Sequence, residues 1–175
     1  AAQLALGQSW RQQLTAPVVM LASSREGEES AWLDAWQIFI KQHSDVQVNW
    51  LIVPRHPQRV AEVESLLLSG GLRVSRRSTW GQEGPALGSE LNTYPTPVVL
   101  LGDSLGEMAL YYSLSDVALL GGSFEKLGGQ NLIEAAACAC PIVMGPHTFN
   151  FAEASEAAQA LGAAQRASDM AEAVR

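Results

Sequence analysis

The chain has 175 residues, of which 47% are hydrophobic and 17% charged, and its formal net charge is −7 at pH 7. This composition is too apolar for a disordered protein and suits one soluble α/β domain with a full core. The acidic balance argues against nucleic acid or direct membrane contact as the main interaction, although local backbone dipoles still allow a single small anion to bind.

The first half of the chain alternates apolar runs with segments of helical spacing. The run 17–23 (PVVMLAS) predicts a buried strand, and 30–43 predicts a helix. A second strand over 46–54 ends at a proline, and a helix over 58–71 ends at a Gly-Gly pair. The short run 72–78 (LRVSRRS) predicts a third strand near a sheet edge.

The second half continues the alternation after a polar, Gly-rich segment over 80–95, which predicts a loop or an irregular hairpin. The remaining predicted elements are strand 97–103, helix 104–115, strand 116–123, a helix from Asn131, strand 140–145, helix 149–161 and strand 163–167. Strands that are continuously apolar and alternate with helices indicate a parallel sheet covered on both faces. The predicted fold is therefore α/β, a Rossmann-like doubly wound parallel sheet.

Three of these strands end in polar or Gly-rich segments: IVPRH, LLGDSLGEM and LLGGSFEKLGGQNLIE. Ligands of open parallel sheets bind beyond the carboxyl ends of the strands, so the three segments should gather at one rim of the sheet. This convergence predicts the ligand site better than any single motif does.

The pattern of Asn131 and Glu134 supports two interpretations that can both be true. As Asn-x-x-Glu they form a capping box, in which each side chain satisfies a backbone N–H of the first helical turn. The same helix start attracts a phosphate that Gly128 and Gly129 allow to approach the backbone, and the carboxylate is then placed to accept ribose hydroxyls. Gly121 and Gly122 similarly suit either a turn or a close approach to a ligand.

Two further positions at the rim carry polar side chains. Ser104 and Glu107 match a second capping box, which is the favoured reading of the Glu107 side chain. Gly106 and Met108 stand where backbone groups and a soft apolar side chain can hold a base. Arg55 follows a strand and offers bidentate recognition of a phosphate, although many arginines are only solvated surface residues.

Other conspicuous side chains are predicted to be structural. Trp32, Trp36 and Trp50 belong to the core, and His56 and His147 lack partners at metal-ligand spacing. Cys138 and Cys140 are predicted to be reduced, buried thiols, because their spacing suits neither a disulfide nor a metal site. The sequence contains no Walker lysine, no zinc-type spacing and no Gly-x-Gly-x-x-Gly.

Taken together, the motifs resemble the carboxyl-terminal domain of the bacterial 3-deoxy-D-manno-octulosonic acid (Kdo) transferases, which are GT-B glycosyltransferases specific for lipid A. The resemblance runs from about residue 17 to 165 through SSREGEE, VPRHPQR, GDSLGEM, DVALLGGSF, GGQNLIEA and PIVMGPHTFNFAEA. The sequence departs from the family pattern at Gln130 and Arg25, where histidine is common.

The resemblance implies a binding site for the donor CMP-Kdo. The candidate donor-binding residues are Pro54, Arg55, Gly106, Glu107, Met108, Gly122, Ser123, Asn131, Leu132, Ile133 and Glu134. The resemblance implies no metal and no further cofactor. It also implies that the catalytic base belongs to an amino-terminal domain, so no catalytic residue is expected in this chain.

The resemblance further implies a role for the whole enzyme and an organisation for this chain. Such enzymes transfer Kdo from CMP-Kdo to the lipid A precursor (lipid IVA) in lipopolysaccharide synthesis, at the cytoplasmic face of the inner membrane. Residues 1–16 are predicted as an interdomain linker or helix and 17–175 as the donor-binding domain. We expect the acceptor domain to be missing and the fragment to be inactive alone.

Two alternative functions remain open at this point. One is a non-catalytic nucleotide-binding module, which would use the same loops for sensing. The other is half of a GT-B-type sugar-nucleotide epimerase, which would need acid and base residues in this half and a preference for uridine nucleotides.

Overall fold

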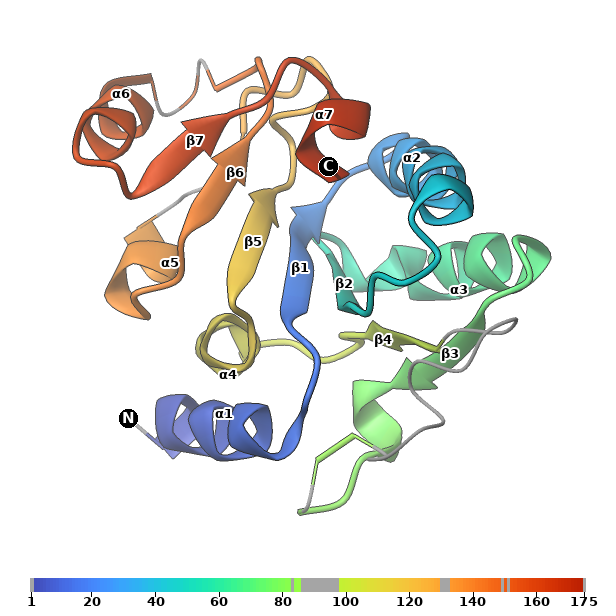
Figure 1. Ribbon diagram of the computed structural model, residues 1–175. Helices are drawn as coiled ribbons and strands as arrows, with labels where there is room; N and C mark the ends of the chain where they lie inside the picture. The colour runs from blue at the N-terminus through green and yellow to red at the C-terminus, as the bar shows by residue number, and fades with distance from the viewer. Residues whose placement is uncertain are drawn as a thin grey trace.

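Seven apolar runs form one sheet in the computed structural model, which describes residues 2–82, 84–85, 98–129, 133–148, 150 and 152–174. The strands are β1 Val18–Ser24, β2 Asn49–Pro54, β3 Arg73–Arg76, β4 Val98–Leu101, β5 Val117–Leu120, β6 Ile142–Met144 and β7 Ala164–Arg166. Their order is β3-β4-β2-β1-β5-β6-β7, and every neighbouring pair is parallel (Figure 1). The predicted doubly wound parallel sheet is confirmed.

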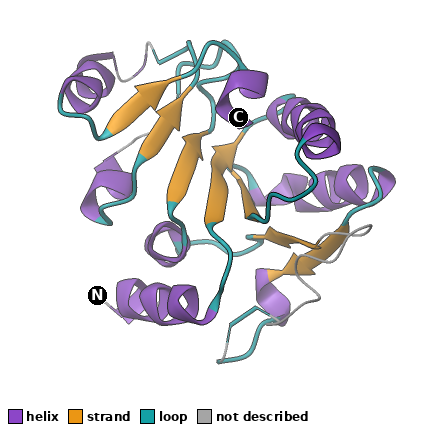
Figure 2. Cartoon of the chain, viewed as in Figure 1, coloured by secondary structure: helices purple, strands orange, loops and turns teal. Residues whose placement is uncertain are grey.

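Helices cover both faces of this sheet (Figure 2). They are α1 Ala2–Gln13, α2 Glu28–Gln42, α3 Val60–Ser69, α4 Met108–Leu114, α5 Ile133–Ala137, α6 Ala152–Ala160 and α7 Met170–Val174, with 3₁₀ turns η1 Pro57–Arg59 and η2 Arg77–Thr79. Successive side chains of a strand point to opposite faces, so β1 contributes Met20 to the core under α1 and α4 and Leu21 to the core under α2 and α3. Every residue of β2 is buried, because both of its faces are covered.

The tryptophans predicted for the core lie there. Trp32 and Trp36 of α2 each meet Trp50 of β2 in edge-to-face geometry, with ring centroids 5.1 and 5.4 Å apart. Such aromatic pairs add to the stabilisation that burial of their surface already gives. They fix α2 against the sheet.

Helix α1 packs against α4 rather than standing apart from the sheet domain (Figure 1). Trp10 is 2% exposed and belongs to the core on that face, and its indole Nε1 donates to the carbonyl of Gln82. Gly7 permits the close packing, since a Cβ there would lie 2.6 Å from the carbonyl oxygen of Leu110. The segment before β1 is thus continuous with the core.

The sheet changes winding direction between β1 and β5, and the backbone is tightly packed at that point. Ser23 has a φ of 53°, and the pairing of β1 with β2 shifts register between Ala22 and Ser24. A Cβ on Gly121, just beyond β5, would lie 2.2 Å from the Ser23 carbonyl oxygen. A glycine at 121 is therefore required for β5 to end beside β1.

One predicted helix begins at a different residue in the structure, and one predicted loop lies mostly outside the described residues. Helix α4 begins at Met108, not at 104, because the preceding turn contains Gly106 with a φ of 72°. Within 80–95, Gly81 and Gly84 form an isolated antiparallel bridge, and most of the remainder of that segment lies outside the described residues.

Replacing Gly121 with alanine should lower the free energy of unfolding by about 2–3 kcal/mol, because the added Cβ meets backbone that has no room to move. Urea unfolding followed by circular dichroism measures the change. The matched control is Gly81→Ala, where an added Cβ meets nothing within 4 Å and the change should stay within ~0.5 kcal/mol. Equal effects of the two substitutions would contradict the packing argument.

Candidate functional site: a pocket at the carboxyl edge of the sheet

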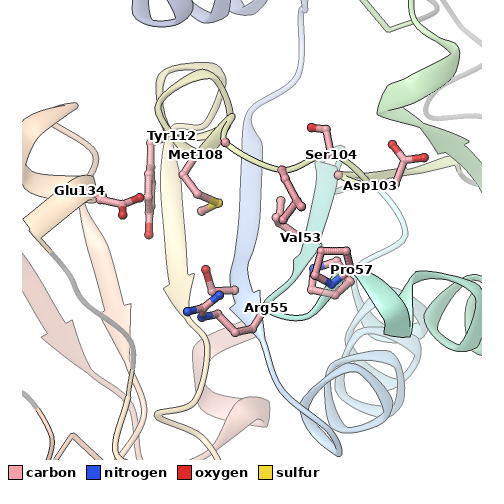
Figure 3. A pocket seen from close by; sticks show the side chains of 13 residues that line it. Val53, Arg55, Pro57, Asp103, Ser104, Met108, Tyr112 and Glu134 are labelled. Carbon is pink, nitrogen blue, oxygen red and sulfur yellow. The ribbon is translucent and has the colours of Figure 1, made fainter.

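A pocket of about 230 Å³ opens at the carboxyl edge of the sheet (Figure 3). Residues at the carboxyl ends of β1 and β2 and in the segments after β2 and β4, together with side chains of α4 and α5, form its wall. They are Ser23, Val53, Pro54, Arg55, Pro57, Gly102, Asp103, Ser104, Leu105, Gly106, Met108, Tyr112 and Glu134. The three polar segments singled out in the sequence thus contribute to one site.

The structure brings five of the predicted donor-binding residues together in this wall: Pro54, Arg55, Gly106, Met108 and Glu134. Arg55 is exposed, and its guanidinium has no hydrogen-bond or ion-pair partner among the described residues, in contrast to most arginines of the chain. In Figure 3 its side chain extends from the end of β2 toward the side of the pocket where Met108 and Glu134 lie. An unpaired guanidinium at this edge is free to bind an anion.

Gly122 and Ser123 have contacts within the protein and do not line the pocket. The N–H of Gly122 donates to the carboxylate of Glu28 at 2.7 Å. Ser123 is fully buried; its hydroxyl donates to the Leu120 carbonyl and accepts from the Gly145 N–H at 2.8 Å. These two residues shape the end of β5 and join it to β6.

The predicted helix start near residue 131 is only partly visible. Asn131 and Leu132 lie outside the described residues, as does Gln130, and α5 is described from Ile133. Glu134 is exposed on this short helix and lines the pocket.

The capping box predicted for Ser104 and Glu107 is wrong. Glu107 itself occupies the N-cap position of α4, without a side-chain capping bond, and its carboxylate pairs with Arg77 at 3.1 Å. The Ser104 hydroxyl hydrogen-bonds with the hydroxyl of Tyr111 instead of a backbone N–H. Both side chains are thus engaged by partners other than the first helical N–H groups.

Residues from the end of β3 support that turn from outside. The Arg77 guanidinium lies 5.1 Å from the ring centroid of Trp10 and 5.8 Å from that of Trp80 while it pairs with Glu107. Asp103 accepts from both the N–H and the hydroxyl of Ser78, at 2.8 and 2.6 Å. Both ends of the turn are therefore fixed before any ligand binds.

Glu28, a residue that the sequence did not single out, joins the loops that follow β1 and β5. It is fully buried and accepts backbone N–H bonds from Arg25 at 2.8 Å, Gly122 at 2.7 Å and Phe124 at 3.1 Å. Burial raises the pKa of its carboxyl, whereas the three N–H donors oppose that rise. The side chain thus bridges the point where the sheet changes winding direction.

Ser23, Asp103 and Tyr112 are among the lining residues that the sequence did not predict. Asp103 is the last residue of the predicted strand 97–103, which is a usable signal, because such positions reach the ligand edge of a parallel sheet. Tyr112 lies within an apolar helical pattern that predicts a core position. Nothing in the sequence indicates the register shift at Ser23.

The described residues offer no other prominent reactive centre. No group of three His, Cys, Asp or Glu side chains that could hold a metal occurs among them. Cys138 and Cys140 are free thiols, and burial raises the pKa of Cys140 to about 12, so it stays protonated at neutral pH. None of the described helices has the length and apolar character needed to span a membrane.

Two bacterial proteins of similar sequence carry the same name. The chain is 45% identical over 170 residues to 3-deoxy-D-manno-octulosonic acid transferase of Bordetella pertussis, covering 96% of the chain and 37% of that protein. The chain belongs to the Kdo transferase family. It is also 38% identical over 144 residues to the Haemophilus influenzae enzyme of that name, covering 82% of the chain and 30% of the enzyme. No protein-family model matches it.

A solved structure has the same fold. The crystal structure of the C-terminal CMP-Kdo binding domain of WaaA from Acinetobacter baumannii superposes with a TM-score of 0.81 at 29% identity, covering 99% of this chain and 86% of that one. The chain spans about a third of the length of the Kdo transferases it matches and nearly all of this domain. The predicted resemblance to the carboxyl-terminal domain of the family is confirmed.

Replacing Glu28 with glutamine should destabilise this Kdo-transferase domain by about 1–3 kcal/mol, because one acceptor oxygen becomes an NH₂ that faces backbone donors. Thermal or urea unfolding measures the loss. Glu26→Gln, which makes the same change at an exposed position of the same loop, is the control and should be close to neutral. A neutral Glu28→Gln would show that the bridge contributes little to stability.

Proposed function

We propose that the chain binds the cytidine monophosphate part of CMP-Kdo, as the donor-binding domain of a Kdo transferase. The observation that carries the proposal is the pocket in which the unpaired Arg55, the turn at Gly106–Met108 and the carboxylate of Glu134 face one space. The similarity to the solved CMP-Kdo binding domain of WaaA supports it.

Each part of the pocket suits one part of the nucleotide. Arg55 offers a planar donor fork for the phosphate. Gly106 is exposed and has a φ of 72°, so that its backbone is open to a base, and the thioether of Met108 supplies polarisable apolar contact. Glu134 accepts hydrogen bonds from ribose hydroxyls.

We propose that the whole enzyme carries out an inverting displacement at the anomeric carbon of Kdo, as the resemblance to the family implies. As the bond to the sugar breaks, the departing CMP phosphate gains negative charge, and Arg55 stabilises it. We propose that a preceding domain of the whole protein supplies the base and binds the acceptor, the lipid A precursor lipid IVA. The proposal requires no metal and places the enzyme at the cytoplasmic face of the bacterial inner membrane.

Calorimetric titration of the chain with CMP, UMP and UDP tests the substrate class. We expect CMP to bind more tightly than either uridine nucleotide, because the base and the single phosphate both fit. A preference for UDP would overturn the Kdo assignment and favour the epimerase alternative. No binding of any of the three would overturn nucleotide binding by this chain.

Arg55→Ala should weaken CMP binding about tenfold or more, because a charge-assisted hydrogen bond to phosphate contributes ~1.5–3 kcal/mol. Calorimetry measures the dissociation constant. The control is Lys41→Ala, which removes a cation from the last turn of α2, at the opposite edge of the sheet. If Arg55→Ala binds CMP as tightly as the unaltered chain, Arg55 does not hold the phosphate.

A further inference from the structure

Tyr112 is a buried side chain of the pocket whose polar end has no partner. The residue is 2% exposed and belongs to the core under α1 and α4, yet it lines the pocket beside Met108. Its hydroxyl makes no hydrogen bond with any of the described residues. Buried tyrosine hydroxyls usually find a partner, so this one is available to a ligand in the pocket.

Tyr111, the preceding residue of α4, differs from Tyr112 in this respect. Tyr111 is also fully buried, but its hydroxyl bonds with Ser104 within the protein. The two phenols lie on one helix and differ in whether the protein itself satisfies them. Only Tyr112 retains its full hydrogen-bonding capacity for a ligand.

Glu134 lies beside Tyr112 at one end of the pocket. Figure 3 shows the carboxylate next to the phenol, whose hydroxyl end points in the same direction as the sulphur of Met108. Burial raises the pKa of Tyr112, and the charge of Glu134 raises it further, so the phenol keeps its proton at neutral pH. The pocket therefore presents a hydrogen-bond donor and an anionic acceptor side by side.

A vicinal diol matches that pair. One hydroxyl of a ribose can donate to the Glu134 carboxylate while its neighbour accepts from the Tyr112 phenol, which satisfies both protein groups at once. A deoxyribose provides one hydroxyl and leaves one of the two protein groups without a partner, which costs binding energy when the group left over is the buried phenol.

We propose that Tyr112 is a specificity-determining residue that donates a hydrogen bond to a ribose hydroxyl of the bound nucleotide and, with Glu134, selects ribonucleotides over deoxyribonucleotides. This inference rests on the proposed CMP site and adds a contact that the strand-end motifs do not include. It assigns a ligand-binding role to a residue of the helix α4 core.

The test is a comparison of CMP with its 2′-deoxy and 3′-deoxy analogues, titrated into the unaltered chain and into Tyr112→Phe. We expect Tyr112→Phe to weaken CMP binding between about threefold and tenfold, the usual effect of one neutral hydrogen bond. The loss should disappear with the analogue that lacks the hydroxyl contacted by the phenol. Tyr111→Phe is the matched control and should leave the ratio of CMP to deoxy-CMP affinities unchanged.

The outcomes separate this inference from the proposed function. If the unaltered chain binds CMP and Tyr112→Phe weakens CMP and both analogues by the same factor, the phenol does not contact the ribose and the inference is overturned. Unchanged CMP affinity in Tyr112→Phe overturns it as well. If the unaltered chain binds no cytidine nucleotide at all, the proposed function itself fails.

Discussion

The site depends on one buried carboxylate. Glu28 starts α2, and its side chain crosses to the loop after β5, where it accepts from Gly122 and Phe124 as well as from Arg25 of its own loop. The chain leaves β1 and β5 toward opposite sides of the sheet, so the loops that follow these two strands diverge. The side chain of Glu28 joins the two loops. Three N–H donors compensate the burial of a charge that would otherwise be costly.

A second set of contacts holds the other side of the pocket. Arg77 and Ser78, which follow the edge strand β3, bind Glu107 and Asp103 at the two ends of the turn after β4. The rim is therefore assembled from loops that the protein itself fixes, while the side chains of Arg55, Glu134 and Tyr112 have no hydrogen-bond partner within the part of the chain that the structure describes. This division between supporting and free polar groups is what a preorganised binding site requires.

Much of the architecture could be predicted from the sequence, because continuously apolar strands separated by helical patterns leave few alternatives to a covered parallel sheet. The strand ends also located the pocket, since Pro54, Gly106 and Met108 follow directly from sheet topology. Glu107 was misassigned because Arg77, its partner, lies 30 residues away, and local spacing carries no information on such pairs.

Two other residues of the site, Glu28 and Tyr112, were not predictable. The role of Glu28 depends on backbone donors 94 and 96 residues distant. Tyr112 was missed for a different reason: an apolar periodicity marks burial but does not show which buried hydroxyl lacks a partner. The rim of a parallel sheet is therefore easier to locate from sequence patterns than the groups that complete the site.

The packing of α1 has a practical consequence for anyone who wishes to express this domain. Sequence patterns place its start at Pro17, yet Trp10 fills the core beneath α1 and offers one face to the guanidinium of Arg77. A protein trimmed to begin at Pro17 would leave a hole the size of an indole and uncover the apolar side of α4. A shortened form of the domain should therefore retain all of α1, from Ala2 onward.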